Sequence, residues 1–189
     1  MSTLFVNNLN TASGSTITVP TGKKLVAPGH VLQVQHFQLT TSQEFVIGAA
    51  HTDYAITNFT VNITPVSTSS IIKLEAQLFH EHANAVHSSV FFFYRDSTKL
   101  ANTQSSPSNR KIGIAVGTLS YYDNDAATTP DMLHMGYFDS PSSTSAIAYK
   151  LGVNMNGSNN LFINRTINDT DSNGNERGVS WISATEIAQ

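Results

Sequence analysis

The chain has 189 residues and a mass of 20.4 kDa, which is enough for one domain with a sizeable core. Only 12% of its residues are charged, its formal net charge is −3, and it contains no cysteine. These values exclude a disulfide framework, a thiolate site and the basic surface that nucleic-acid binding requires. With 22 Ser, 21 Thr and 17 Asn, the composition favours turns and strand faces over helices.

Residues 1–29 differ in character from the rest of the chain. They contain one short strand candidate, 15–19, followed by Pro20, Gly22 and Pro28. The N-terminus lacks the basic start and long apolar segment of a signal peptide. We expect 1–29 to be an attachment arm or the first strand of the domain, and 30–189 to be the β-sandwich domain.

Alternation with a period of two residues is the clearest pattern beyond residue 30. In 57–64 the apolar residues Phe59, Val61 and Ile63 alternate with polar ones, and 72–78 shows the same pattern. Loops rich in Gly, Pro, Ser and Asn separate such runs, so the sequence predicts an all-β fold, an antiparallel β-sandwich such as a jelly roll. Further strands are predicted at 31–39, 89–96, 112–119, 133–138, 146–154, 160–165 and 179–187.

Two of these strands depart from one-sided alternation. The run 90–94 is apolar on both faces, and in 112–119 small residues alternate with branched ones. Since a sandwich strand normally shows one face to solvent, this pattern favours a second subunit that covers the outer face. The alternative is that loops of the same chain cover it. The predicted subunit interface consists of Val90, Phe92, Tyr94, Gly113, Ala115 and Gly117.

Two segments have metal-ligand spacing. His80 and His82 lie on the same side of a predicted strand, and His87 could join them from a turn. The alternative is a group of polar histidines at a strand end, and we expect no metal cofactor. The segment 169–176 matches the first half of a calcium loop, but Ser180 stands where the closing glutamate would be. A solvated hairpin loop is the alternative there.

Hydrolytic chemistry finds little support, because the chain has no G-x-S-x-G motif and only thirteen carboxylate side chains. We therefore expect no catalytic residues and no cofactor. Aromatic and amide side chains in loops are instead typical of carbohydrate recognition. The residues predicted to contact a receptor are Tyr122, Asn124, Asp125, Asn168 and Asn173.

Six stretches follow one another in an order that points to a family. They are Thr21–Val34 (TGKKLVAPGHVLQV), Ile63–Ile72 (ITPVSTSSII), Tyr94–Asp96 (YRD), Phe138–Val153 (FDSPSSTSAIAYKLGV), Ile163–Thr166 (INRT) and Val179–Ala188 (VSWISATEIA). Together they resemble a family of bacteriophage virion proteins of the tail-fibre or receptor-binding type, common in phages of aquatic bacteria. Many such fibres carry a long N-terminal shaft, whereas here the first predicted strand begins at 15. The histidine segment belongs to no motif of the family.

The resemblance implies a jelly-roll head similar in shape to tumour-necrosis-factor and C1q domains, assembled as a homotrimer. The central apolar strands would meet at the three-fold axis, the turn 139–141 would start a late strand, and Trp181 would anchor the last one. It also implies a location on the virion, at the phage tail or on the capsid surface.

These observations give three hypotheses. The first is a short tail fibre or receptor-binding protein, without enzyme activity, that contacts a glycan or protein of the host surface. Its other partners would be copies of itself and virion proteins that bind the segment 1–29, and we expect neither nucleic-acid binding nor membrane insertion. The second is a capsid decoration (cement or head-fibre) protein of the same trimeric fold. The third is a metal-dependent carbohydrate-active enzyme that uses His80, His82 and His87.

Overall fold

A computed structural model describes residues 14, 19, 21, 27–82, 88–100, 109–117 and 128–189. In this part of the chain the structure consists of β-strands joined by loops, and it contains no helix, so none that could span a membrane. The strands are β1 (Val31–Leu39), β2 (Gln43–Phe45), β3 (Asp53–Ile63), β4 (Ile71–His82), β5 (Val90–Arg95), β6 (Thr98–Lys99), β7 (Ala115–Val116), β8 (Asp131–Asp139), β9 (Ile147–Asn154), β10 (Leu161–Ile163) and β11 (Ser180–Ile187).

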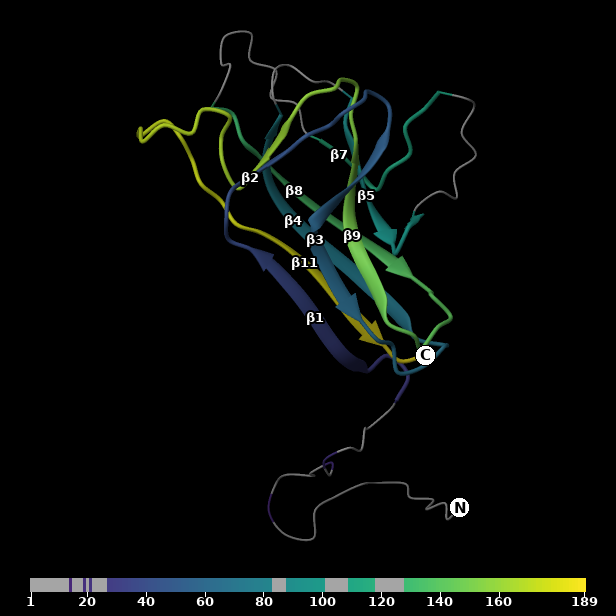
Figure 1. The fold of residues 1–189 in the computed structure, drawn as a ribbon. Coiled ribbons are helices and arrows are strands. Elements are labelled where there is room, and N and C mark those ends of the chain that lie inside the picture. The colour runs from purple at the N-terminus through teal and green to yellow at the C-terminus, as the bar shows by residue number, and fades with distance from the viewer. Residues whose placement is uncertain are drawn as a thin grey trace.

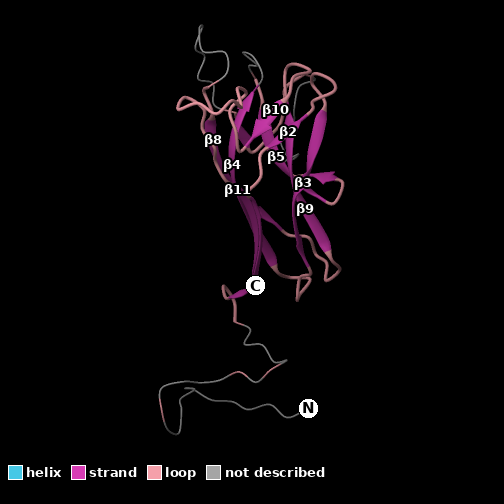
Figure 2. Cartoon of the chain, turned by 60° about the vertical axis from the view of Figure 1, so that its left-hand side comes forward, coloured by secondary structure: helices cyan, strands magenta, loops and turns pink. Residues whose placement is uncertain are grey.

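The strands form two antiparallel sheets that face each other (Figure 2). The first sheet has the order β1-β11-β4-β10-β2, with β8 on the other edge of β4. The second has the order β3-β9-β5-β6, with β7 also paired to β5. When the short strands β2, β6 and β10 are set aside, the orders are β1-β11-β4-β8 and β3-β9-β5-β7. This arrangement confirms the predicted all-β antiparallel sandwich and is consistent with a jelly roll.

The alternating sequence pattern explains which side chains fill the space between the sheets. On β4, Ile72, Leu74 and Leu78 are buried, whereas Lys73 and Glu75 point to the outer face. The core combines side chains from both sheets in one cluster, so each sheet covers the apolar face of the other. Its largest fully buried members include Tyr149, Phe59, Phe91, Phe93, Leu74, Leu151 and Met155.

The predicted strands differ from the observed ones mainly where residues are small or strands are short. Of the predicted strand 112–119 the structure describes 112–117, and within that part only Ala115–Val116 pairs with a neighbour, while Gly113 and Ile114 follow β5 without a regular ladder. The very short strands β2 and β6 had no alternating pattern long enough to predict them. The candidate strand 15–19 and most of the segment 1–29 lie outside the described residues, so the proposed attachment arm stays a prediction.

The two ends of the sandwich are different. At one end, Gly29 donates a backbone hydrogen bond of 2.8 Å to Ala188, and Ala188 donates one of 2.9 Å to His30. The first described strand therefore begins beside the last residues of the chain (Figure 1). The opposite end carries the loops that follow β1, β9 and β10, because Leu39 pairs with Ser180 and Asn154 pairs with Asp53 at that end.

Candidate functional site

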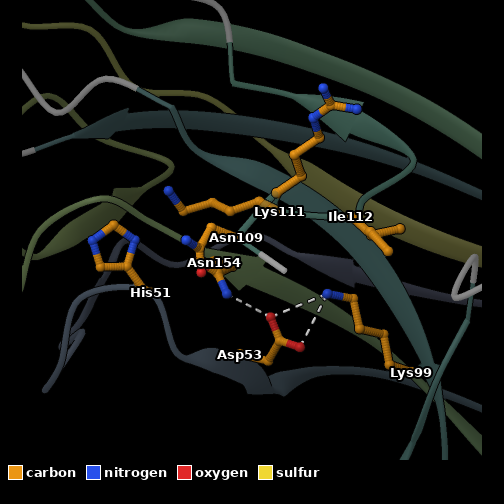
Figure 3. A pocket seen from close by; sticks show the side chains of 8 residues that line it. His51, Asp53, Lys99, Asn109, Lys111, Ile112 and Asn154 are labelled. Carbon is orange, nitrogen blue, oxygen red and sulfur yellow. Dashed lines mark hydrogen bonds and ion pairs between the residues drawn. The ribbon is translucent and has the colours of Figure 1, made fainter. Parts of the chain in front are cut away.

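A basic pocket lies on the outer face of the second sheet, close to the loop-bearing end. Its volume is about 580 Å³. Four side chains come from the strands β3, β6 and β9 and the turn before β3, and four from the segment that precedes β7 (Figure 3). The lining residues are His51, Asp53, Lys99, Asn109, Arg110, Lys111, Ile112 and Asn154.

The register between β3 and β9 positions two residues at the floor of this pocket. Asp53 and Asn154 are opposite each other in the β3–β9 pair, so their side chains lie on the same face. Asn154 Nδ2 donates a hydrogen bond of 2.7 Å to Asp53 Oδ1, and Lys99 Nζ lies 3.0 Å from Asp53 Oδ2. Asn154 is buried, whereas the Asp53 side chain is 35% exposed. The result is a carboxylate that is fixed from two sides and still faces solvent.

Lys99 also covers the apolar part of this face. Its Nζ lies 3.9 Å from the centroid of the Phe92 ring, and the ring packs on Gly152 of the adjacent strand. Phe92 is fully buried within the single chain. The ammonium group is thereby held between the ring and Asp53, which combines a cation–π contact with an ion pair.

The electrostatic character of the pocket differs from that of the whole chain. Among the described residues, Lys99, Arg110 and Lys111 line it, and Asp53 is the one carboxylate among them. With histidine counted as neutral, the described lining residues carry a formal net charge of +2, in a chain whose formal net charge is −3. Such a local concentration of cations favours anionic ligands.

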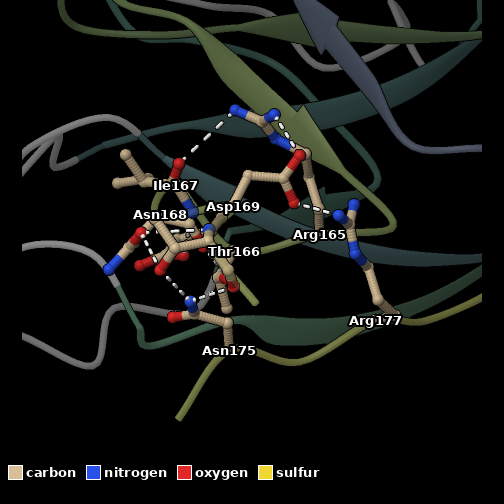
Figure 4. Close-up of polar contacts among 9 residues, drawn as sticks. Arg165, Thr166, Ile167, Asn168, Asp169, Asn175 and Arg177 are labelled. Carbon is tan, nitrogen blue, oxygen red and sulfur yellow. Dashed lines mark hydrogen bonds and ion pairs between the residues drawn. The ribbon is translucent and has the colours of Figure 1, made fainter. Parts of the chain in front are cut away.

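The second candidate surface is the loop 164–178, in which the predicted contact residues Asn168 and Asn173 are both exposed. Asn168 Oδ1 accepts hydrogen bonds from the backbone and hydroxyl of Thr170, at 3.2 and 3.0 Å. Asn175 Nδ2 donates to the Thr170 carbonyl at 2.7 Å, which closes the turn (Figure 4). Asn173 is thus presented at the tip of a loop that its own polar groups hold in shape.

Asp169 joins the two arms of this loop. Its carboxylate accepts a 2.9 Å hydrogen bond from Arg165 Nη1 and also pairs with Arg177 (Figure 4). Two guanidinium groups therefore surround the oxygen atoms that a calcium ion would need, which opposes the half calcium loop considered from the sequence. The same loop rests on Glu81, which is buried and accepts hydrogen bonds from Ile167 N at 2.8 Å and Thr129 N at 2.9 Å.

The histidines of the possible metal site point into the sandwich. His80 and His82 have ring centroids 5.0 Å apart, and His80 is fully buried beside Phe91. His82 Nε2 lies 3.3 Å from Ser89 Oγ, while both ring nitrogens of His80 have no hydrogen-bond partner. His87 lies outside the described residues, and within those residues no three His, Asp or Glu side chains are grouped to hold a metal ion.

Three of the six residues of the predicted subunit interface are buried within the single chain. Val90, Phe92 and Gly117 are buried, and a Cβ atom at Gly113 would come within 2.7 Å of Val90 Cβ. Phe92 is therefore covered within its own chain, as in the alternative considered from the sequence. Tyr94 and Ala115 are half-buried, so these six positions remain a prediction for an interface.

No family model matches the chain, and neither does any curated protein sequence. Solved structures that are similar to it include the IBDV viral particle, with 12% identity, 91% of this chain and 43% of that chain covered, and a TM-score of 0.44. The VP2 subviral particle of infectious bursal disease virus has 15% identity over 92% of this chain and 42% of that chain, with a TM-score of 0.38. The chain spans less than half the length of either protein.

Sequence reasoning missed the basic pocket, and the described residues include only part of the predicted receptor-contact set. Tyr122, Asn124 and Asp125 lie outside the described residues, so their role stays a prediction. The pocket residues come from four separate segments and form no motif. The one signal in the sequence was the adjacent pair Arg110 and Lys111, which stands out in a chain with so few cations.

Proposed function

We propose that the chain is a virion structural protein that contacts the host cell surface, as a short tail fibre or receptor-binding protein of a bacteriophage. The observation that carries the proposal is the division of the sandwich into two unlike ends. Residues 29, 30 and 188 meet at one end, while the loop 164–178 and the start of β3 lie at the other. A protein that is anchored through one end of a rigid sandwich can present the loops of the opposite end to a receptor.

The sequence adds independent support. The six stretches that resemble phage virion proteins include most of β9 and β11, which are central strands of the two sheets. The exposed loop side chains are mainly Ser, Thr, Asn and Asp, which bind hydroxyl-rich ligands through short hydrogen-bonding groups. The segment that precedes residue 30 joins the domain at the end away from these loops, and we assign the attachment to other virion proteins to it.

The proposal includes assembly as a homotrimer. Three equivalent surfaces in one particle component would turn weak contacts into durable attachment through a high effective concentration. Val116 is 68% exposed and adjoins Ala115 and Gly117 of the predicted interface. Contact with a second copy would therefore remove exposed apolar surface at Val116 from water.

The location on the particle tests the proposal. Virions that carry the chain are labelled with gold-conjugated antibodies against residues 27–189 and viewed by electron microscopy. Label at the tail, together with blocked adsorption when free protein is added, is the expected result. Label over the head with unchanged adsorption would support the capsid decoration protein instead, and particles without label would contradict the virion role.

A further inference from the structure

The strand β1 forms an edge of the first sheet. Among the described residues it pairs with β11 alone, from the pair Val31–Ile187 to the pair Leu39–Ser180, and Figure 1 shows it at the outer side of the sheet. In an antiparallel pair, every second residue directs its backbone N–H and C=O away from the neighbouring strand. This nine-residue strand therefore presents a row of backbone groups that no described strand uses.

The sequence of β1 lacks the features by which edge strands usually prevent the addition of a further strand. Such edges carry Lys or other charged residues, Pro, or a bulge within the strand. The run VLQVQHFQL contains no Lys, Arg, Asp, Glu or Pro, and its one register irregularity lies at its start, between Val31 and Gln33. The edge from 33 to 39 is therefore regular and suited to strand addition.

The side chains of β1 alternate between the two faces of the sheet. Phe37 is opposite the buried Ile182, and its ring lies 6.1 Å from the ring of Phe59 in the facing sheet. His36 is opposite Ser183 on the outer face. Phe37 is only half-buried although it packs against the core. An apolar side chain beside it, on the inner face of an added strand, would complete its burial.

The segment 15–19 of this chain has the pattern that fits such an edge. Ile17 and Val19 alternate with Thr16 and Thr18, so an extended strand would be apolar on one face and polar on the other. All four residues are β-branched, which favours strands. Val19 belongs to no strand in the structure, and its side chain is 42% exposed. The single chain therefore gives Val19 no sheet to join.

The residues between this segment and the domain can carry it to a neighbouring copy. Gly29 is bonded to Ala188 at one end of the sandwich, beside the start of β1. When extended, 20–30 can span up to about 36 Å, which exceeds the distance of about 10 Å between two packed sheets. Where copies stand side by side with the same ends together, the segment enters along β1 from that end. Its residue 19 then lies nearer that end than residue 15, so the segment runs antiparallel to β1.

We propose that residues 15–19 of a second copy add to β1 as an antiparallel strand, and that these arms are exchanged around the homotrimer. Ile17 lies opposite Phe37 on the inner face of the sheet. Thr18 lies opposite His36 on the outer face. The inference rests on the homotrimer of the proposed function and adds a contact between copies on the first sheet, separate from the predicted interface on the second. The rest of the N-terminal arm stays available for attachment to other virion proteins.

Disulfide trapping in the full chain tests the exchange, because the chain has no cysteine of its own. A variant with Thr18→Cys and His36→Cys is oxidised and separated on a denaturing gel without reductant. We expect covalent dimers and trimers, at two and three times 20.4 kDa. Val34→Cys and Gln38→Cys, each in place of His36→Cys, cover register shifts of two residues, which keep the side chains on the same face.

The matched control combines Thr18→Cys with Gln35→Cys. Gln35 is exposed on the same strand, but it is opposite the buried Ala184 and so belongs to the inner face. Because its Cβ would point away from that of residue 18, linkage should be at least about tenfold weaker than for the outer-face pair. Equal linkage in the two variants would show random collision and overturn the proposal.

A third substitution tests the apolar contact. Ile17→Asp, added to the Thr18→Cys and His36→Cys variant, should lower the yield of linked chains at least about tenfold, because it places an unpaired charge against the Phe37 ring. Thr16→Asp is its control and should leave the yield unchanged, because residue 16 faces solvent on the added strand. Unchanged circular dichroism spectra establish that the sandwich folds in each variant. Equal yields from the two substitutions would contradict the proposed inner face.

The outcomes separate this inference from the proposed function. Loss of free thiols without a rise in mass would show that the segment pairs with β1 of its own chain, and free thiols in every variant would show no pairing. Either result overturns the exchange, while tail labelling and blocked adsorption would still support the attachment role. If linked dimers and trimers form but the particles carry no label, the exchange stands and the virion role fails.

Discussion

The hydroxyl of Tyr149 donates a hydrogen bond of 2.7 Å to Asp139 Oδ2, inside the sandwich. Arg95 Nη1 donates to the same carboxylate at 3.0 Å, so one acceptor group joins strands of both sheets. Burial, and next the hydrogen bond with Asp139, raises the pKa of Tyr149 far above its ordinary value. The hydroxyl therefore stays protonated and acts as a donor at any pH at which the domain is folded.

Tyr149→Phe should lower the free energy of unfolding by about 1.5–3 kcal/mol, because it removes a hydrogen bond to a charged, buried acceptor. Urea denaturation followed by circular dichroism measures the change. Tyr54→Phe is the control, since the Tyr54 hydroxyl has no hydrogen bond to the described residues and its loss should change stability by less than about 0.5 kcal/mol. Equal losses in the two variants would show that the Asp139 contact contributes nothing specific.

Gly152→Ala should destabilise the domain by about 1–3 kcal/mol, because an added methyl group would overlap a well-packed ring. A Cβ atom at this position would lie 2.8 Å from Phe92 Cδ2, and Phe92 is fully buried. Gly136→Ala is the matched control, because the nearest atom to its Cβ would be Leu74 O at 3.4 Å. If the two variants have the same urea midpoint, the Phe92 ring moves aside at no cost in stability, and the prediction is wrong.

Val116→Arg tests the predicted subunit contact without disturbing the fold, because the side chain is 68% exposed. Light scattering behind a sizing column should give three times 20.4 kDa for the unchanged chain and 20.4 kDa for the variant. Gly117→Arg is less suitable, since a side chain there would meet Ser89 and His82 within the same chain. A variant that remains a trimer would place the interface elsewhere on the sandwich.

Stability should fall between about pH 6.5 and pH 4 because of the two inward-facing histidines. Burial lowers the pKa of His82 to about 4, and burial together with the charge of His82 holds the pKa of His80 well below its ordinary value. In this window the unfolded chain binds protons that the folded chain excludes, so acid favours unfolding by up to about 1.4 kcal/mol per pH unit and histidine.

His82→Gln should reduce this pH dependence, since glutamine does not titrate and can still bind Ser89. Urea denaturation at pH 7, 5.5 and 4.5 gives the difference between the variant and the unchanged chain at each pH. The difference should shift in favour of the variant as the pH falls. A difference that is constant with pH would show that His82 titrates alike in the folded and unfolded chain.

The fold could be predicted from the sequence largely because the alternation of apolar and polar residues follows the alternation of buried and exposed side chains along each strand. The predicted 31–39 coincides with β1, and 133–138, 146–154 and 179–187 match β8, β9 and β11 within two residues at each end. The described part of the run, 112–117, is not a full strand, because its glycines approach Val90 at the start of β5 and Ser89 just before it instead of continuing a ladder. Short strands such as β2 carry too few residues to show a period.

The candidate site could not be predicted in the same way. Asp53, Lys99, Lys111 and Asn154 are far apart in the sequence. Strand register brings Asp53 beside Asn154, and Lys99 and Lys111 come from two further segments. The doubly apolar run at 90–94 was also ambiguous, because the sequence does not show that the ammonium group of Lys99 lies over the Phe92 ring. A long charged side chain that shields an aromatic ring looks, in the sequence, like any solvent-exposed residue.

The hydrogen bonds between residues 29–30 and Ala188 have a practical consequence for engineering. Because both ends of the folded region leave the sandwich side by side, residues 29–188 can be spliced into a surface loop of another protein without stretching either junction. Such a guest domain would keep its basic pocket and the loop 164–178 pointing away from its carrier. Arrays of the domain on a scaffold would then display the same binding surface in every copy.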